Sequence, residues 1–151
     1  MEHKSTDELN QLLEKTKPSQ LEAYLKDNSK YLAGEPKSFY YYMKNVITEK
    51  GIKIKDIYSF AGVSASYGDK ILRQEEPSRS RDLIIRLCIA GHFSWNETNR
   101  ALKLYGFSEL YAKNPRDACI IVALNNRIYD MAEIDDMLIK QGKEIITKDE
   151  K

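Results

Sequence analysis

Cysteine and histidine are the side chains best suited to metal binding or nucleophilic chemistry, and this 151-residue chain has two of each. Cys88 and Cys119 lie within apolar stripes of helical spacing, where a cysteine usually acts as a small core residue. Neither His3 nor His92 has a cysteine or carboxylate at the spacing of metal ligands. The sequence therefore predicts no disulfide, no zinc site and no cofactor.

Enzyme motifs are missing as well. The sequence contains no P-loop, no GxGxxG and no GxSxG. The acidic run at 133–137 lies opposite Ile134 and Leu138 on a helical pattern, which favours a solvated helix face over a carboxylate site. We expect that the protein is not an enzyme.

The most informative pattern spans residues 54–73, where two short helical patterns flank a glycine. The first pattern consists of apolar residues that stop at Gly62, namely Ile54, Ile57, Phe60 and Ala61. The second follows Ser64, a favourable N-cap residue, and carries Tyr67, Ile71 and Leu72. Two short helices joined by a glycine-centred turn indicate a helix-turn-helix.

Composition sets the fold class. Apolar residues make up 42% of the chain, enough for a buried core, whereas only 7 glycines and 4 prolines interrupt the helical patterns. We therefore expect an all-α fold. No apolar run approaches the ~20 residues needed to span a bilayer, and the N-terminus lacks the apolar segment of a secretory signal, so the cytoplasm is the expected location.

The chain divides into a central region with a helical hairpin on each side. The predicted parts are an N-terminal hairpin at 1–35, a helix-turn-helix domain at 36–110, a C-terminal hairpin packed on it at 111–146, and a tail at 147–151. Capping boxes at Ser5 with Glu8 and at Ser19 with Glu22 begin the two helices of the first hairpin. This hairpin is expected either to pack against the body or to act as a dimerisation arm.

Three further helices are expected in the central region. The first, at 39–50 after the N-cap Ser38 and before Gly51, has a buried face of Phe39, Tyr42, Met43, Val46 and Ile47. The second and third follow the N-caps Ser80 and Ser94, and end at Gly91 and Gly106.

An internal repeat links this region to the C-terminal hairpin, because residues 81–110 align with 116–146 after one inserted residue. Each unit begins with Arg-Asp. We expect these acids to favour the helix dipole, with a functional role as the alternative.

Residues 38–106 thus hold five helices with the helix-turn-helix at the second and third. Together with Gly62-Val63-Ser64, Tyr67, Ile71 and the following Pro77 and Ser78, this stretch resembles the λ-repressor-like, Cro/C1-type (XRE) family of bacterial DNA-binding domains. The flanking hairpins look like those of Firmicute proteins of this type. The resemblance covers about half the chain and implies a sequence-specific transcriptional regulator that binds double-stranded DNA as a homodimer.

The same resemblance implies a recognition helix whose exposed face is formed by Ser64, Ala65, Ser66, Tyr67, Asp69, Lys70 and Arg73. Ser66 and Lys70 are expected to read base edges, since lysine can donate to guanine O6 and N7. Phosphate contacts are expected from the hydroxyls of Ser64 and Tyr67 and from the cations Lys53, Lys55, Arg73, Arg79 and Arg81.

Two departures from the family qualify this expectation. The family usually has alanine at the position of Tyr58 and valine or isoleucine at the position of Gly68, so we predict that the Tyr58 ring fills the space that Gly68 leaves. Asp69, Glu75 and Glu76 place acids where phosphates would approach, and the net charge is only +1. The alternative function is therefore a helical protein–protein adaptor or antitoxin-like module with weak or no DNA binding.

Overall fold

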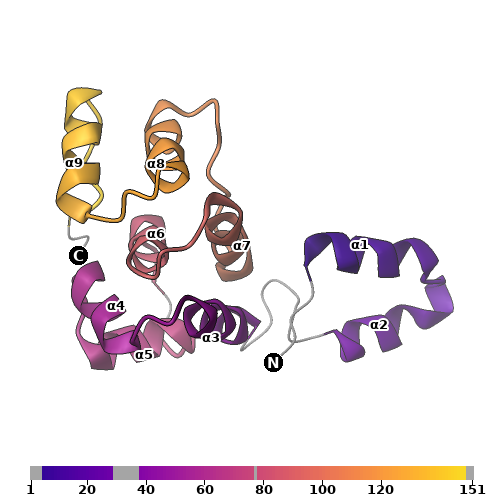
Figure 1. The fold of residues 1–151 in the computed structure, drawn as a ribbon. Coiled ribbons are helices and arrows are strands. Elements are labelled where there is room, and N and C mark those ends of the chain that lie inside the picture. Colours follow the sequence, from indigo (N-terminus) through magenta and orange to yellow (C-terminus); the bar gives the residue numbers. More distant parts are fainter. Residues whose placement is uncertain (1–4, 29–37, 77, 149–151) are drawn as a thin grey trace.

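The computed structural model describes residues 5–28, 38–76 and 78–148, and within them it is helical and contains no strand (Figure 1). The expected all-α class is confirmed. The elements in chain order are α1 (Thr6–Lys15), the 3₁₀ helix η1 (Pro18–Gln20), α2 (Leu21–Asp27), α3 (Ser38–Lys50), α4 (Ile54–Ala61), α5 (Ala65–Leu72), α6 (Arg81–Ala90), α7 (Trp95–Tyr105), α8 (Pro115–Asn125) and α9 (Met131–Lys140). None of the helices in these ranges is long and apolar enough to cross a bilayer.

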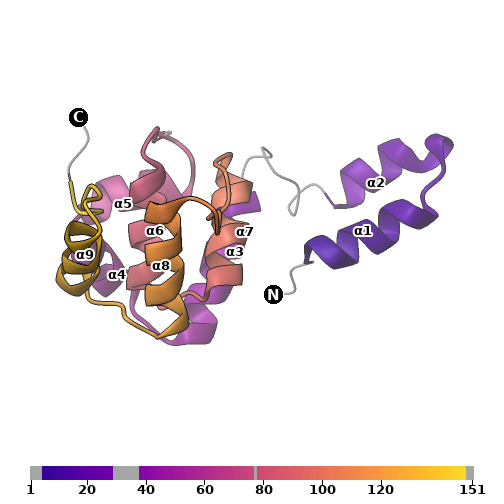
Figure 2. The same ribbon diagram turned by 90° about the horizontal axis from the view of Figure 1, so that it is seen from above.

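Helices α1 and α2 form a hairpin that projects from the rest of the molecule in both ribbon views (Figures 1 and 2). Ser5 caps α1 as predicted, because its Oγ accepts the Glu8 N–H at 3.1 Å. The predicted box at Ser19 is wrong. Pro18 begins a 3₁₀ turn that includes Ser19, and α2 then begins without a side-chain cap. The expected ends of this hairpin, including His3, lie outside the described residues.

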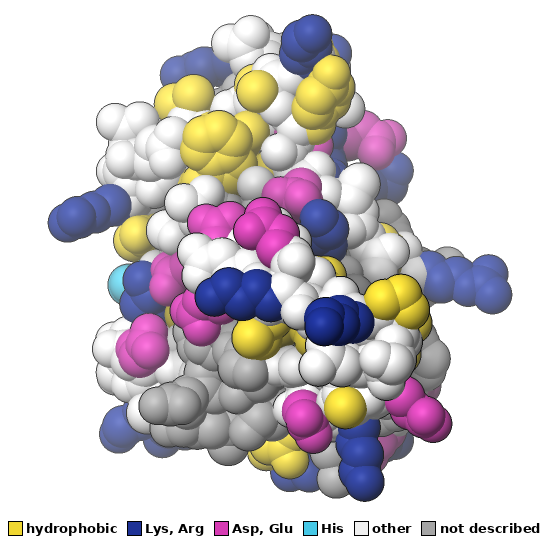
Figure 3. Space-filling model, turned by 90° about the vertical axis from the view of Figure 1, so that its right-hand side faces the viewer, with side chains coloured by type: hydrophobic (Ala, Val, Ile, Leu, Met, Phe, Trp, Pro, Cys, Tyr) yellow, Lys and Arg dark blue, Asp and Glu magenta, His cyan; other side chains and the backbone are white. Residues whose placement is uncertain are grey.

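The hairpin leaves most of its leucines exposed, since Tyr24 is the only apolar side chain of α1 and α2 that is buried. Figure 3 shows the molecule from the side of this hairpin. On this face Lys and Arg side chains are interspersed with Asp and Glu, so the surface is not charged with one sign alone. Attraction of a polyanion to this face would therefore be weak.

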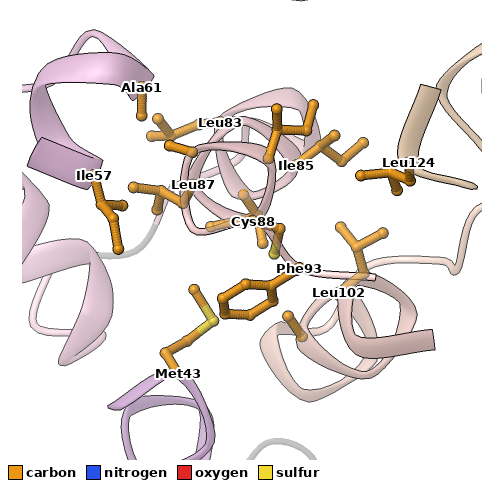
Figure 4. Close-up of a cluster of buried hydrophobic side chains, with 14 of the residues drawn as sticks. Met43, Ile57, Ala61, Leu83, Ile85, Leu87, Cys88, Phe93, Leu102 and Leu124 are labelled. Carbon is orange, nitrogen blue, oxygen red and sulfur yellow. The ribbon is translucent and has the colours of Figure 1, made fainter. Parts of the chain in front are cut away.

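The core is built around α6. Its residues from Leu83 to Ala90 are all buried, and a helix that is buried on every side has neighbours all round. Figure 4 shows side chains of α3, α4, α7 and α8 pointing toward it, among them Met43, Ile57, Leu102 and Leu124.

The predicted buried face of α3 is confirmed at all five of its positions. The expectation for α4 is wrong at one position. Phe60 is 61% exposed, and Tyr58 is buried at 3% exposure. With 100° between successive residues, Phe60 falls roughly a third of a turn from the stripe that contains Ile57, Tyr58 and Ala61.

The two halves of the sequence repeat, α6–α7 and α8–α9, are joined by reciprocal ion pairs. Arg81 donates from Nη1 and Nη2 to the Asp117 carboxylate at 3.0 and 2.9 Å. Arg116 donates in the same way to Asp82, at 2.8 Å for both bonds. The Arg-Asp starts, for which we expected a favourable helix dipole, thus also tie one unit to the other.

Equivalent contacts recur within each unit. Arg81 Nε donates to the Ser108 carbonyl and Arg116 Nε to the Glu144 carbonyl, both at 3.0 Å. In each unit, the arginine that begins the first helix therefore binds the segment that follows the second helix. The repeat seen in the sequence is also a structural repeat.

Candidate nucleic-acid interface

A left-handed turn at Gly62 sets the angle between α4 and α5. Gly62 has φ +79°, a conformation that glycine adopts without the steric penalty of a β-carbon. The Val63 N–H returns to the Tyr58 carbonyl at 3.0 Å and closes the end of α4. Ser64 then caps α5 as predicted, with its Oγ accepting the Tyr67 N–H at 3.2 Å.

Helix α5 has one buried and one exposed side. Gly68, Ile71 and Leu72 are buried against the core. The seven residues expected to form its outer face are all exposed: Ser64, Ala65, Ser66, Tyr67, Asp69, Lys70 and Arg73. Lys53 and Lys55, at the start of α4, are also exposed.

The contact between α4 and α5 depends on the pair Tyr58 and Gly68. A β-carbon added to Gly68 would lie 2.4 Å from Cε1 of the Tyr58 ring, far inside van der Waals contact. The ring therefore fills the space that a larger residue would need at position 68, as predicted. Any side chain at position 68 would therefore overpack this contact, and a larger one more severely.

Tyr58 also holds Asp69. Its hydroxyl donates to Asp69 Oδ1 at 2.7 Å. Burial and the adjacent Asp69 carboxylate both raise the pKa of Tyr58, so the phenol keeps its proton. One acceptor oxygen of Asp69 is thus engaged from inside the protein, which reduces its value as a reader of bases.

The cations at the outer face of α5, Lys70 and Arg73, make only weak contacts within the protein, so both remain able to contact DNA. Lys70 Nζ lies 3.7 Å from Glu76 Oε2, and both side chains are more than half exposed. An exposed pair of this kind contributes at most about 1 kcal/mol, so a DNA contact can replace it. The Arg73 guanidinium lies 4.9 Å from the ring centroid of Tyr40, which orients it without neutralising its charge.

The two arginines around the start of α6 differ. Arg79 is exposed. Arg81 is held by the Asp117 carboxylate and by the carbonyls of Ser108 and Glu109. A phosphate could recruit Arg81 only by displacing the Asp117 carboxylate, which breaks one of the two reciprocal ion pairs between the repeat units.

Sequence reasoning missed Arg86, which lies in the buried central helix α6. It is 7% exposed, and its guanidinium donates to the Ala61 carbonyl at 3.0 Å and to the Ile146 carbonyl at 2.9 Å. It therefore joins the end of α4 to the C-terminal segment. The available signal was one charged residue within the run LIIRLCIA.

A second surface feature lies away from α5. Phe60, His92, Tyr129 and Met131 line a shallow hollow between the end of α4, the turn after α6 and the start of α9. The rings of His92 and Tyr129 are stacked, with centroids 4.1 Å apart and planes 9° apart. Partial burial, with Lys50 nearby, lowers the pKa of His92, which favours the neutral, more apolar ring.

The potential metal ligands do not converge in the ranges that the structure describes, where no group of three His, Cys, Asp or Glu side chains could hold an ion. Cys88 is a fully buried core residue as predicted, and Cys119 is partly exposed.

Comparison of the chain with models of protein families, with curated proteins and with solved structures finds no match. Function must therefore be argued from the geometry.

Proposed function

We propose that the protein is a sequence-specific DNA-binding transcriptional regulator of the helix-turn-helix, XRE type, acting in the bacterial cytoplasm. In this proposal α3 to α7 form the five-helix domain and α5 is its recognition helix. The observation that carries the proposal is the α4–Gly62–α5 unit, in which a fixed turn presents a polar outer face on a helix anchored by the core.

The mechanism is occupancy of an operator. A helix with side chains is about 10–12 Å across, and the major groove is about 12 Å wide, so α5 fits the groove. In this mechanism Ser66 and Lys70 contact base edges, and Lys70 leaves its ion pair with Glu76 to donate to a guanine. The remaining cations that we assign to phosphates are Lys53, Lys55, Arg73 and Arg79.

A homodimer would place two copies of α5 on half-sites roughly 34 Å apart. The α1–α2 hairpin supports this part of the proposal through four exposed leucines, Leu12, Leu13, Leu21 and Leu25. A surface of this kind on a projecting hairpin would gain from burial against a second copy.

The adaptor function is the second candidate, and the hollow around Phe60 favours it. A large aromatic side chain that is 61% exposed, beside a stacked His–Tyr pair, suits an apolar side chain of a protein partner. The adaptor function is also favoured by the acidic side chains on and after α5, which would repel an approaching phosphate: Asp69, Glu75 and Glu76.

Selection of bound sequences from a random duplex pool separates the two functions. For a regulator, we expect a short enriched motif that Lys70→Ala binds more weakly. Lys140→Ala, which removes an exposed lysine of α9, is the matched control and should bind as the unmodified protein does. If no duplex is retained even at low salt, the adaptor function replaces the regulator.

A further inference from the structure

A small pocket lies between the turn after α4 and the start of α6. Its volume is about 200 Å³, well above the roughly 10–15 Å³ that a cavity needs to hold one water molecule. Its polar lining consists of Ser64, Tyr67, Ser78, Ser80 and Arg86, and no acidic side chain is among its lining residues. Every polar side chain on its wall is therefore able to donate a hydrogen bond.

The three serines accept hydrogen bonds from the backbone and keep their own protons for another partner. Ser64 Oγ accepts the Tyr67 N–H at 3.2 Å, and Ser80 Oγ accepts the Leu83 N–H at 3.0 Å. Ser78 Oγ accepts the Ser80 N–H at 3.0 Å. Each contact uses a lone pair, so each O–H can still donate into the pocket.

Arg86 brings a buried positive charge to the same wall. It donates to two neutral carbonyls, and none of the carboxylates in the described residues lies within ion-pair distance of it. Arg81 and Arg116, in contrast, each have an aspartate partner. A buried guanidinium without a counter-charge is unfavourable, and an anion in the pocket would relieve this.

Two helix N-termini add to the positive electrostatic potential that Arg86 creates in the pocket. Ser64 begins α5 and Ser80 begins α6, so two helix N-termini, with their partial positive charge, flank the pocket.

We infer that this pocket binds a phosphate oxyanion, held by the hydroxyls of Ser64, Tyr67, Ser78 and Ser80 with Arg86 as the counter-charge. The inference rests on the proposed function for the source of the phosphate, which we take to be the DNA backbone. A phosphate held here would fix the N-terminus of α5 against one strand and so set its register in the groove. Free phosphate has the same chemistry and is the other source.

The experiment is an NMR titration of ¹⁵N-labelled full-length protein with inorganic phosphate at constant ionic strength, with chloride as the reference. We expect saturable shifts of the amides at 62–67 and 78–83. The double variant Ser78→Ala/Tyr67→Phe removes two donors but keeps both helix caps, and should bind phosphate roughly tenfold more weakly. Ser108→Ala, an exposed serine outside the pocket, should bind as the unmodified protein does.

A short random-sequence duplex forms the second arm. If it competes with inorganic phosphate for these amides, the site and its DNA source are both supported. If phosphate binds and no duplex does, the pocket is supported as a free-phosphate site and the proposed function fails. If phosphate shifts none of these amides, or shifts them equally in the double variant, the inference is overturned, whether or not the duplex binds elsewhere.

Discussion

The packing of Tyr58 against Gly68 should be disturbed by a change at either position and partly restored when the small and large residues are exchanged. Gly68→Ala gains about 1 kcal/mol of helix propensity, but its β-carbon would lie 2.4 Å from the Tyr58 ring. Overpacking of this kind costs roughly 1–3 kcal/mol, so we expect a small net loss for alanine and a larger loss for Gly68→Val. Tyr58→Ala empties the space of a buried ring and should cost about 3–5 kcal/mol.

The double variant Tyr58→Ala/Gly68→Val places the valine in the space that the ring leaves. Its loss of unfolding free energy should be smaller than the sum of the single losses by roughly 0.5–3 kcal/mol, the range of coupling between residues in contact. Urea denaturation followed by circular dichroism measures all four proteins.

Tyr58→Phe is the matched control for the hydroxyl. It removes the 2.7 Å bond to Asp69 and keeps the ring, so Gly68→Val should cost as much in the Tyr58→Phe background as in the unmodified protein. Additivity of Tyr58→Ala and Gly68→Val within about 0.5 kcal/mol would show that the ring does not decide the requirement for glycine.

Changes at the repeat interface, beside Lys70 and on the α1–α2 hairpin test three other parts of the structure. Asp117→Asn should lower the unfolding free energy more than Asp82→Asn, because Asp117 is 4% exposed and also accepts the Tyr111 N–H, and equal losses in urea would contradict this. Glu76→Gln should tighten binding to a selected duplex a few-fold by releasing Lys70, and weaker binding in fluorescence anisotropy would count against Lys70 as a base reader. Leu13→Glu/Leu25→Glu should shift a dimer toward monomer in sedimentation velocity, whereas Val122→Glu, at an equally exposed apolar position of α8, should not; unchanged dimer in the first variant would remove the hairpin from the interface.

The sequence was sufficient for features that depend on neighbouring residues. The buried face of α3, the caps Ser64, Ser80 and Ser94, and the left-handed Gly106 all follow from local patterns, and the structure shows each of them. The exchange of size between Tyr58 and Gly68 could also be predicted, because both positions lie in one helix pair.

Long-range polar contacts could not be predicted in this way. Asp117 pairs with an arginine 36 positions earlier in the chain, and spacing within one helix holds no information about that pairing. Arg86 could not be placed for the same reason, since its acceptors belong to residues 25 and 60 positions away. For Phe60, the apolar spacing predicted the wrong face of an eight-residue helix, because the Tyr58 ring is the one buried, against Gly68 of α5.

The most direct test of DNA binding through α5 is the salt dependence of affinity for a duplex selected from a random pool. Each phosphate neutralised contributes about −0.9 to the slope of log K against log salt. With Lys53, Lys55, Arg73 and Arg79 each neutralising one phosphate, we expect a slope of roughly −3 or steeper for each protomer and a slope shallower by about one for Arg73→Ala. A slope near zero, or no binding to any duplex at low salt, would show that α5 does not bind DNA through these cations.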